Sequence, residues 1–345
     1  MGKETLSFSF DFLFAHMACP ICACYAKKRA RMTTGTLKWL TRCLGGSCAL
    51  GAVILVTELQ AQDFTYTNAN GTITITGYTG PGGDVVIPAT IDGLLVTSIG
   101  DGAFYSLPSL TGITIPDVVT NLGDWAFASC GNLARLAIGK GITTIKGGYE
   151  KGTWGTFQFC SSLTRIAIPD NVTRISDGVV HLGGALGAFY GCSSLTNVTI
   201  GKGLTYLGAG AFNYCNNLLS VYFQGDAPTA GIDYFGVDIF HPDELVTLYY
   251  LPGTTGWGST YASRPTMLWN PQVQTTDGSL GVRQNQFGFN IAGTPGIPLV
   301  IEASTNLAAR AWVPLQTCTL TNGLVYFGDA QSTNYPSRFY RIRSP

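Results

Sequence analysis

Three columns of apolar residues recur along the middle of the chain at matching intervals. Aligning the chain on an Ala-Phe or Thr-Phe pair gives five units, each with a Phe, a Leu six residues later and a further apolar residue. The columns are Phe104, Phe127, Phe157, Phe189 and Phe212; Leu110, Leu133, Leu163, Leu195 and Leu218; and Ile115, Ile138, Ile168, Ile200 and Phe223. All three columns step by 23, 30, 32 and 23 residues, and this common spacing predicts an internal repeat.

Polar and apolar residues alternate within each unit with the period of a β-strand. The stretch Ser194 to Ile200 (SLTNVTI) predicts a short strand with one face turned inward. A second short extended segment follows, as in Val172 to Ile175 and Leu204 to Leu207, with Gly and Asp at the corners. Because one unit cannot bury its apolar side alone, we expect the units to stack into a solenoid with parallel strand ladders and a continuous core.

The repeated unit has a recognisable consensus. The stretch Gly187 to Ile200 (GAFYGCSSLTNVTI) resembles the BspA-type leucine-rich repeat family, and the resemblance covers roughly residues 85–225. It implies a mainly β leucine-rich-repeat solenoid of about five to six coils with N- and C-terminal caps. It also implies a secreted or cell-surface protein that binds proteins or mediates adhesion, with no catalytic residues to carry over. The residues of this unit predicted to be core are Phe189, Cys192, Leu195, Val198 and Ile200.

Four cysteines occupy one repeat position, and the first unit has Leu107 there, which indicates a small buried apolar site. They are Cys130, Cys160, Cys192 and Cys215. Export would permit disulfides. However, Cys318 makes the number of cysteines after residue 62 odd, and equivalent positions in successive coils place side chains in parallel. We therefore predict buried free thiols rather than disulfides or a metal ladder.

Turn-rich segments set the boundaries of the solenoid, which we predict over residues 63–270 including its caps. Residues 63–88 are expected to form the N-terminal cap, with a hairpin around Asn68 to Gly71 (NANG). Residues 224–270 are expected to form the C-terminal cap, in which Trp257 and Trp269 seal the last coil.

A separate module is predicted after a polar linker over residues 271–280. Residues 281–345 contain five strand candidates separated by turn residues, which is typical of a small β-sandwich. The candidates are residues 286–291, 299–303, 312–317, 324–327 and 339–342. This region resembles a C-terminal β module found on exported bacterial proteins, and the resemblance implies no particular activity.

The first 62 residues have the pattern of an N-terminal extension followed by a secretory signal peptide. Basic residues precede an apolar stretch, Cys48 to Val56, and small Ala61 suits the position before a cleavage site. The apolar stretch is short for a membrane span, so cleavage near Ala61 or Gln62 is favoured over a retained anchor. Met32 is an alternative start to Met1. We expect a secreted or cell-surface protein with no membrane span in the mature chain.

Composition narrows the classes of partner and chemistry. Charged residues make up 12% of the chain, which is about half the usual share. After residue 61 there are thirteen Lys and Arg against seventeen Asp and Glu, so this part is weakly acidic and nucleic acid is not an expected partner. His181 and His241 lie in no metal or triad motif. The corner carboxylates are turn-formers first, namely Asp101, Asp117, Asp124 and Asp170. We expect no catalytic, cofactor or metal site.

Two insertions interrupt the array at the same corner of adjacent units. They are Lys146 to Gly155 (KGGYEKGTWG) and Ser176 to Gly187 (SDGVVHLGGALG), and they add seven and nine residues to the corresponding connections. Insertions on one edge of a solenoid are often binding surfaces, and tolerated loop growth without a ligand is the alternative. The candidate binding residues are Tyr149, Glu150, Lys151, Trp154, His181 and Leu182.

The leading functional hypothesis is an exported, non-catalytic repeat protein that binds a protein or a surface glycan. One alternative is a carbohydrate-binding or carbohydrate-active extracellular protein that uses carboxylates on the solenoid. Another is a structural component of the cell envelope that is attached through its C-terminal module. The sequence leaves the partner and the oligomeric state open.

Overall fold

The computed structural model describes residues 63–148, 154–181, 184–232, 238–242, 245–308 and 311–343. All of them belong to the unit Leu59–Pro345. The predicted extension and signal peptide, residues 1–62, lie outside the described residues. Within the described part, no helix is both long and apolar enough to cross a membrane.

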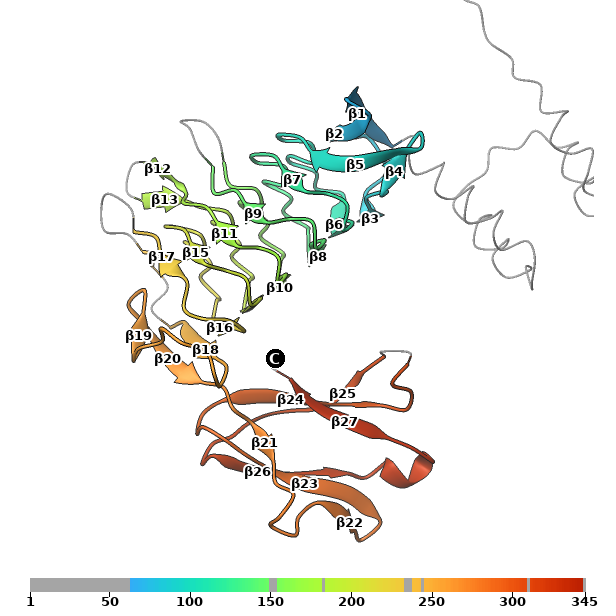
Figure 1. Cartoon of the computed structure of the whole chain (residues 1–345), viewed down its shortest axis with the longest axis vertical. Helices are drawn as coiled ribbons and strands as arrows, with labels where there is room; N and C mark the ends of the chain where they lie inside the picture. The colour runs from blue at the N-terminus through green and yellow to red at the C-terminus, as the bar shows by residue number, and fades with distance from the viewer. Residues whose placement is uncertain are drawn as a thin grey trace, which may run out of the picture. The chain divides into compact units, whose positions relative to one another are not determined.

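Successive coils each contribute one strand to a long parallel face (Figure 1). The strands are β3 (Gly83–Val86), β6 (Leu110–Thr114), β8 (Arg135–Ala137), β10 (Arg165–Ile168), β14 (Asn197–Ile200), β16 (Ser220–Phe223), β18 (Thr247–Tyr250), β19 (Thr260–Tyr261) and β20 (Arg264–Leu268). They pair as β3-β6-β8 and as β10-β14-β16-β18-β20, with β19 antiparallel at the edge. Apolar residues stand in register between coils, so that Val198 of β14 lies opposite Ile166 and Val221.

A second set of shorter strands forms another parallel ladder along the same coils. These strands are β5 (Leu94–Ile99), β7 (Asn121–Leu122), β9 (Thr144–Ile145), β11 (Arg174–Ile175), β15 (Tyr206–Leu207) and β17 (Thr229–Ala230). β5 pairs with β7, and β9, β11, β15 and β17 pair in chain order. From β7 to β15 the second residue of each strand is buried. Both ladders confirm the leucine-rich-repeat solenoid predicted from the sequence.

A column of stacked Phe rings fills the centre of the coils. The rings belong to Phe104, Phe127, Phe157, Phe189, Phe212 and Phe240, all of which are fully buried. Neighbouring ring centroids lie 4.9 to 5.9 Å apart, and the ring planes are within 18° of parallel. The predicted core residues of the fourth unit, from Phe189 to Ile200, are at most 1% exposed, which confirms that prediction. Phe240 lies in the segment expected to be a cap, and it extends the stack by one coil.

Corner aspartates tie each coil to the next. Asp117 Oδ1 accepts a hydrogen bond from the backbone N–H of Lys140 at 2.8 Å, and Asp170 Oδ1 accepts one from Lys202 at 2.9 Å. Asp101 Oδ1 accepts the backbone N–H of Asp124 at 2.8 Å. Since each carboxylate satisfies a backbone donor of the following coil, these residues act as the turn-formers that the sequence predicted.

The four equivalent cysteines are buried and form no disulfide, as predicted. Each thiol donates to the carbonyl oxygen of the stacked Phe in the preceding coil, at distances of 3.0 to 3.4 Å. Burial raises the pKa of the Cys130 thiol to about 11 and that of Cys192 to about 12. The column is therefore a row of protonated thiols that link one coil to the next.

A hairpin covers the N-terminal end of the Phe stack. It consists of β1 (Phe64–Ala69) and β2 (Thr72–Tyr78), with β4 (Thr90–Ile91) antiparallel to β5 beside it. Asn70 and Gly71 have φ angles of 53° and 77°, as the predicted turn requires. The rings of Phe64 and Tyr78 lie 6.2 and 5.6 Å from the ring of Phe104, and so they close the end of the stack.

The two tryptophans predicted to seal the C-terminal end of the solenoid pack in different apolar clusters. The Trp257 ring lies 4.7 Å from Phe223 and 5.4 Å from Tyr250, against the solenoid core. Trp269 instead packs at the edge of a second apolar cluster, and its Nε1 donates to the carbonyl of Pro298 at 2.9 Å. The prediction for Trp269 is met only in part, because its ring lies 6.4 Å from that of Tyr222 in β16 but packs in a cluster shared with the following module.

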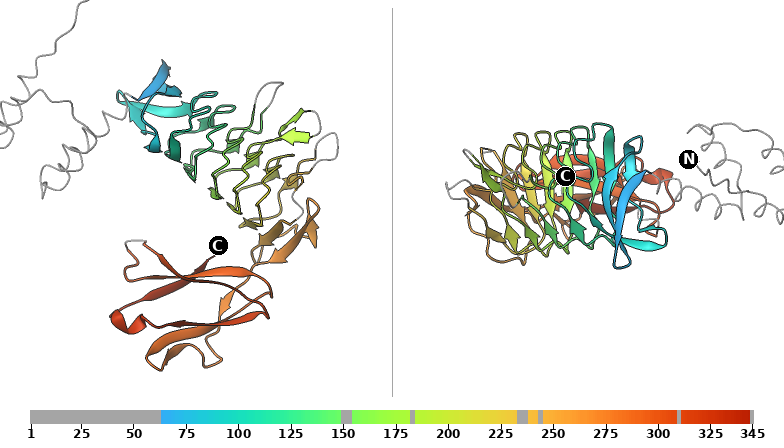
Figure 2. Two further views of the ribbon diagram at one scale, coloured as in Figure 1. Left: turned by 180° about the vertical axis from the view of Figure 1, so that it is seen from behind. Right: turned by 90° about the horizontal axis from the view of Figure 1, so that it is seen from above.

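Two antiparallel sheets make up the C-terminal region (Figure 2). One contains β21 (Gln272–Val273), β22 (Gly281–Arg283), β23 (Gln286–Ala292) and β26 (Leu324–Asp329); the other contains β24 (Pro298–Ser304), β25 (Val313–Thr319) and β27 (Phe339–Arg343). A short 3-10 helix, η2 (Ser332–Asn334), precedes β27. Phe289 and Phe327 of the first sheet share a core with Leu299 and Ile301 of the second. The five predicted strands match β23 to β27, and β21 falls within the stretch expected to be a linker.

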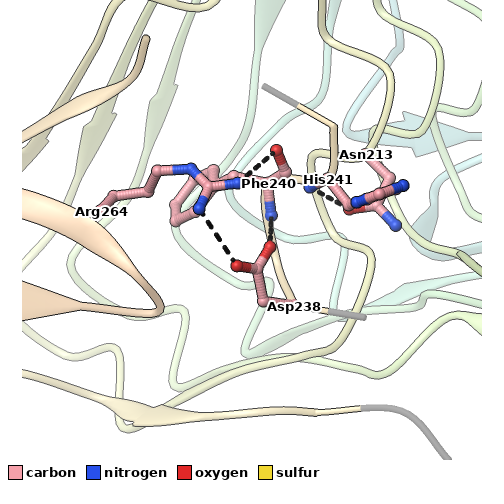
Figure 3. Close-up of polar contacts among 5 residues, drawn as sticks. All are labelled: Asn213, Asp238, Phe240, His241 and Arg264. Atoms are coloured by element: carbon pink, nitrogen blue, oxygen red, sulfur yellow. Dashed lines mark hydrogen bonds and ion pairs between the residues drawn. The ribbon is translucent and has the colours of Figure 1, made fainter. Parts of the chain in front are cut away.

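A polar network fixes the last coil of the Phe stack (Figure 3). Asp238 Oδ1 accepts the backbone N–H of Phe240 at 2.9 Å, and Asp238 Oδ2 lies 3.3 Å from Nη1 of Arg264. Nη2 of Arg264 donates to the carbonyl of Phe240 at 3.2 Å. Because Arg264 is only 8% exposed, this charge pair is largely shielded from water and holds Phe240 on the stack.

The buried thiols should be chemically silent in the folded protein. We expect iodoacetamide at pH 8 to modify the half-buried Cys318 and to leave Cys192 unmodified, since the thiolate is the reactive form. Between pH 9 and about 12 the unfolded chain loses its thiol protons first, so stability should fall as pH rises through this range. Peptide mapping by mass spectrometry, with guanidinium-denatured protein as the fully reactive control, checks the first expectation. Labelling of Cys192 in native protein at the rate of Cys318 would contradict it.

The buried charge pair should contribute far more to stability than an exposed one. Arg264→Met leaves the carboxylate of Asp238 buried without its cation, and we expect the free energy of unfolding to fall by about 3 kcal/mol. Arg135→Met is the matched control, because Arg135 pairs with Asp84 on the surface and its loss should have little effect. Urea denaturation of both variants measures the difference. Equal effects of the two substitutions would show that the network in Figure 3 does not hold the last coil.

Candidate functional site

Of the six residues predicted as a binding edge, the structure describes the side chain of Trp154. Tyr149, Glu150, Lys151 and Leu182 lie outside the described residues. The backbone of His181 ends β12 (Val179–His181), which pairs with β13 (Gly184–Leu186) as a small antiparallel hairpin. The second insertion therefore forms a hairpin of its own. Trp154, at the end of the first insertion, connects the predicted edge to a larger group of aromatic side chains.

Seven rings from six successive coils form a continuous row, which we call the aromatic ridge. It consists of Tyr105, Trp125, Trp154, Phe159, Tyr190, Tyr214 and His241. The ring of Tyr105 lies 5.7 Å from that of Trp125 and 5.6 Å from that of Trp154, between centroids. Trp154 lies 6.2 Å from Phe159 at an interplanar angle of 85°. The ridge thus crosses from coil to coil through direct ring contacts.

The second half of the ridge continues in the same manner. The ring of Phe159 lies 5.4 Å from Tyr190 at 89°, and Tyr190 lies 5.1 Å from Tyr214 at 48°. Tyr214 lies 6.4 Å from the ring of His241. Most neighbouring rings are steeply tilted, in contrast to the parallel rings of the buried stack. Edge-to-face and tilted contacts of this kind stabilise aromatic pairs by about 0.5–1.5 kcal/mol each.

The ridge rings are half in contact with the protein and half open to solvent. Tyr105, Phe159 and Tyr214 are 41%, 40% and 43% exposed. Trp125, Trp154 and Tyr190 are of intermediate exposure, and His241 is exposed. A folded chain gains nothing from leaving such large apolar areas in water, whereas a partner that covers them gains their burial.

Three ridge residues stand in a backbone conformation that bulky side chains rarely adopt. Trp125, Phe159 and Tyr214 have φ angles of 49°, 60° and 58°, and they are the aromatic residues with positive φ in the part of the chain that the structure describes. Such left-handed backbone costs an L residue about 1–2 kcal/mol relative to the usual conformations. Strain of this kind clusters at functional positions.

In the fourth coil a glycine, Gly191, occupies the same corner and adopts positive φ without strain. Gly191 occupies in the fourth coil the corner position of Phe159 and Tyr214, with a φ of 73°. A Cβ atom at Gly191 would lie 2.6 Å from Cδ1 of Phe159, so the Phe159 ring lies directly over this glycine. The corner therefore accepts glycine in one coil and a strained aromatic residue in two others.

The ridge carries no Lys or Arg, and its first two coils are flanked by carboxylates. Asp101 and Asp124 stand three residues before the stacked Phe of their coils, which is the repeat position that Trp154 occupies in the third coil. Burial, together with the neighbouring Tyr214, raises the pKa of Tyr190, so its phenol stays a protonated hydrogen-bond donor. The surface offers apolar ring area and neutral hydroxyl, indole and imidazole groups.

The C-terminal end of the ridge is fixed by hydrogen bonds across coils. The buried Asn213 accepts the backbone N–H of His241 with its Oδ1 at 2.8 Å and donates from Nδ2 to the carbonyl of Ala185 at 3.2 Å. The Asp238 and Arg264 network positions the residue before His241 (Figure 3). The last ridge residue therefore rests on a backbone that is bonded to two neighbouring segments.

The described residues show no assembled metal centre. Within them, no group of three His, Cys, Asp or Glu side chains is placed to hold a metal ion. The corner carboxylates are engaged with backbone N–H groups of the next coil, as described above.

Of the seven ridge residues, Trp154 was predicted from the sequence as a binding residue and the other six were not. The missed residues come from three different offsets relative to the stacked Phe. Tyr105, Tyr190 and His241 follow it directly, whereas Phe159 and Tyr214 lie two residues after it. A usable signal was present, because Phe and Tyr replace Ser and Gly at a corner that requires positive φ.

Comparison with known proteins identifies the repeats. Residues 85–182 and 185–248 match the family described as BspA type leucine rich repeat region, in six copies. The comparison with curated proteins finds no match.

Several solved structures are similar to part of the chain. The leucine rich repeat protein of T. pallidum is 25% identical, with a TM-score of 0.38, over 56% of this chain and 86% of that one. A leucine rich cell surface protein of Faecalibacterium prausnitzii is 28% identical, with a TM-score of 0.37, over 47% of this chain and 38% of that one. A leucine-rich repeat protein of Bacteroides ovatus is 23% identical, with a TM-score of 0.34, over 56% of this chain and 61% of that one.

The family match agrees with the strand ladders and the Phe stack described above. It extends the resemblance seen in the sequence beyond residue 225, to the coil of Phe240 and to Leu248 in β18. Residues 85–182 and 185–248 consist of BspA-type leucine-rich repeats.

Proposed function

We propose that this chain is an exported, non-catalytic binding protein of the cell surface, and that it engages a macromolecular partner through the aromatic ridge. The observation that carries the proposal is the row of half-exposed, partly strained rings that runs across six coils. Tyr and Trp are enriched among the residues that dominate binding energy at interfaces. The leucine-rich repeats supply the scaffold, since such repeats typically bind proteins and present residues of successive coils along one edge.

The position of the ridge next to the two insertions supports the same proposal. Trp154 lies at the end of the first insertion and in the centre of the ridge, and the hairpin of β12 and β13 forms the second. The residues of the predicted binding edge thus flank the ridge in sequence. We propose that the insertions extend the contact surface that the ridge begins.

The two alternative functions, a carbohydrate-active enzyme and a structural component of the cell envelope, require other features of the structure. A carbohydrate-active enzyme needs a free carboxylate pair, whereas Asp101, Asp117 and Asp170 accept backbone hydrogen bonds that stabilise the coils. A structural envelope component needs attachment through its C-terminal sheets and makes no use of the ridge. We propose in addition that the protein is exported, that it is located at the cell surface and that it takes part in adhesion.

Removal of ridge rings should abolish attachment to the partner without unfolding the chain. We expect the triple variant Tyr105→Ala, Phe159→Gly, Tyr214→Gly to lose at least tenfold in binding, since each ring buries apolar area on contact. Binding of the full chain to whole cells and to protein and glycan arrays measures the effect. Circular dichroism confirms that the variants stay folded.

The matched control removes exposed leucines that lie outside the ridge. Leu95→Ala and Leu219→Ala delete residues that are 49% and 54% exposed, and they should leave binding unchanged. If the ridge variant and the leucine variant bind as well as the parent chain, the ridge is not the binding surface. Hydrolysis of an arrayed polysaccharide that disappears with a single Asp substitution would replace the proposal with the enzymatic alternative.

A further inference from the structure

Charges of alternating sign stand along one corner of the solenoid, between the two strand ladders. Four successive coils carry an exposed charged residue two positions after the third apolar column. This charge row consists of Asp117, Lys140, Asp170 and Lys202. The preceding coil has Ala89 at this position, two residues after Ile87, and the following coil has Gly225. The row therefore contains four charges, and each charge has a neighbour of opposite sign.

Packing explains the carboxylates and the glycines at this corner, but it does not explain the lysines. Each Asp of the row accepts the backbone N–H of the following Lys, as described above. Each Lys lies between two glycines, which leave room for the preceding coil. A Cβ atom at Gly141 would lie 2.4 Å from the carbonyl oxygen of Asp117, and one at Gly203 would lie 2.1 Å from that of Asp170. Since any residue between these glycines supplies the N–H, the corner does not require a cation.

The side chains of the row stand clear of their surroundings. Among the ion pairs between described residues, none includes Lys140 or Lys202. The neighbouring positions on both sides of the row hold small, uncharged residues. These are Thr114, Ala137, Ala167 and Thr199 on the strand side, and Thr120, Thr143, Thr173 and Thr205 on the other. The two ammonium groups are therefore open to contact with another molecule.

The row is complementary to its own reverse. The stacked Phe rings of its four coils are separated by 4.9, 5.3 and 5.4 Å, so the coils that carry the charges are almost evenly spaced. When a second copy of the chain lies alongside in the opposite direction, Asp117 of one copy faces Lys202 of the other. Lys140 faces Asp170 in the same way. Both contacts occur twice around a two-fold axis, which is the symmetry of most protein dimers.

Other arrangements of two rows satisfy fewer charges. Two copies that run in the same direction without an offset oppose like charges at every coil, which disfavours association. An offset of one coil in that direction leaves a charge at each end of the row unpaired. The antiparallel arrangement pairs all four charges of each copy. It also places Asp226, the residue after Gly225, near the uncharged Ala89 of the second copy, so no like charge is opposed there.

We propose that two copies of this chain associate antiparallel along the charge row, around a two-fold axis between Lys140 and Asp170. Exposed ion pairs contribute little individually and are screened by salt, so the dimer is weak and depends on ionic strength. The contact uses a different part of each coil from the aromatic ridge. Each charge follows the stacked Phe of its coil by thirteen residues, whereas the ridge residues lie within three. A dimer therefore carries two ridges, which increases avidity for a partner with repeated sites.

Sedimentation equilibrium of the full chain tests the proposal. We expect a monomer–dimer equilibrium at about 20 mM salt, with an association constant that falls roughly tenfold or more at about 500 mM salt. Lys140→Glu with Lys202→Glu should lower the association constant at low salt by a similar factor, because both new carboxylates face aspartates. Arg165→Glu with Arg283→Glu is the matched control. It makes the same change in net charge at exposed positions outside the row and should leave association unchanged.

A mixture of two variants tests the pairing itself. Asp117→Asn with Asp170→Asn removes both negative charges, while the amide oxygen still accepts the corner hydrogen bond from the next coil. Neither this variant nor Lys140→Glu with Lys202→Glu should dimerise alone. An equimolar mixture should form a heterodimer, because the lysines of the first variant face the aspartates of the second.

Three results would overturn the proposal. The first is a parent chain that stays monomeric at about 200 μM in low salt. The second is a dimer that is equally stable in the parent and in Lys140→Glu with Lys202→Glu. The third is a loss of unfolding free energy in that variant without a change in association, since the charges would then stabilise only the stack of coils. All these variants keep the aromatic ridge, so failure here leaves the proposed function to be judged by the ridge variants alone.

Discussion

The stacking of one buried Phe ring per coil is the interaction on which the rest of this structure depends. It sets the distance between coils at 4.9 to 5.9 Å and keeps successive coils in one orientation. The backbone pairing of the strands, the thiol bonds to the Phe carbonyls and the corner aspartates all repeat at the same interval. Removing one such ring typically costs about 3–5 kcal/mol, because the cavity that remains lies between two fixed neighbours.

The same periodicity explains how the proposed binding surface arises as a row of side chains from successive coils. A residue at one corner of a coil is carried to the next coil by a translation of about 5 Å, so side chains at related positions form a row. At the ridge this row is aromatic and half exposed, and three of its members adopt a strained backbone. The geometry that stacks the core rings thus also carries a series of rings along the surface, each within three residues of the stacked Phe of its coil.

Much of the fold could be predicted because its buried positions recur. The columns of Phe189, Cys192 and Leu195 repeat with one spacing, because the residues in these columns occupy the same buried positions in successive coils. The ridge could not be predicted in the same way, since its rings stand at four offsets from the stacked Phe and meet only in space. The contact of Trp269 with the C-terminal module could not be predicted for a related reason: its partner, the carbonyl of Pro298, lies 29 residues further along the chain.

We propose that the ridge rings serve contact with a partner and that the fold does not require them. The most direct measurement is the free energy of unfolding of the double variant Phe159→Gly, Tyr214→Gly, beside Phe189→Ala from the buried stack. Relief of the left-handed backbone offsets much of the lost ring contact, so each ridge substitution should change the unfolding free energy by less than about 1 kcal/mol. Phe189→Ala should lower it by about 3–5 kcal/mol. A double variant as unstable as Phe189→Ala would contradict the account, because the ridge would then be part of the core.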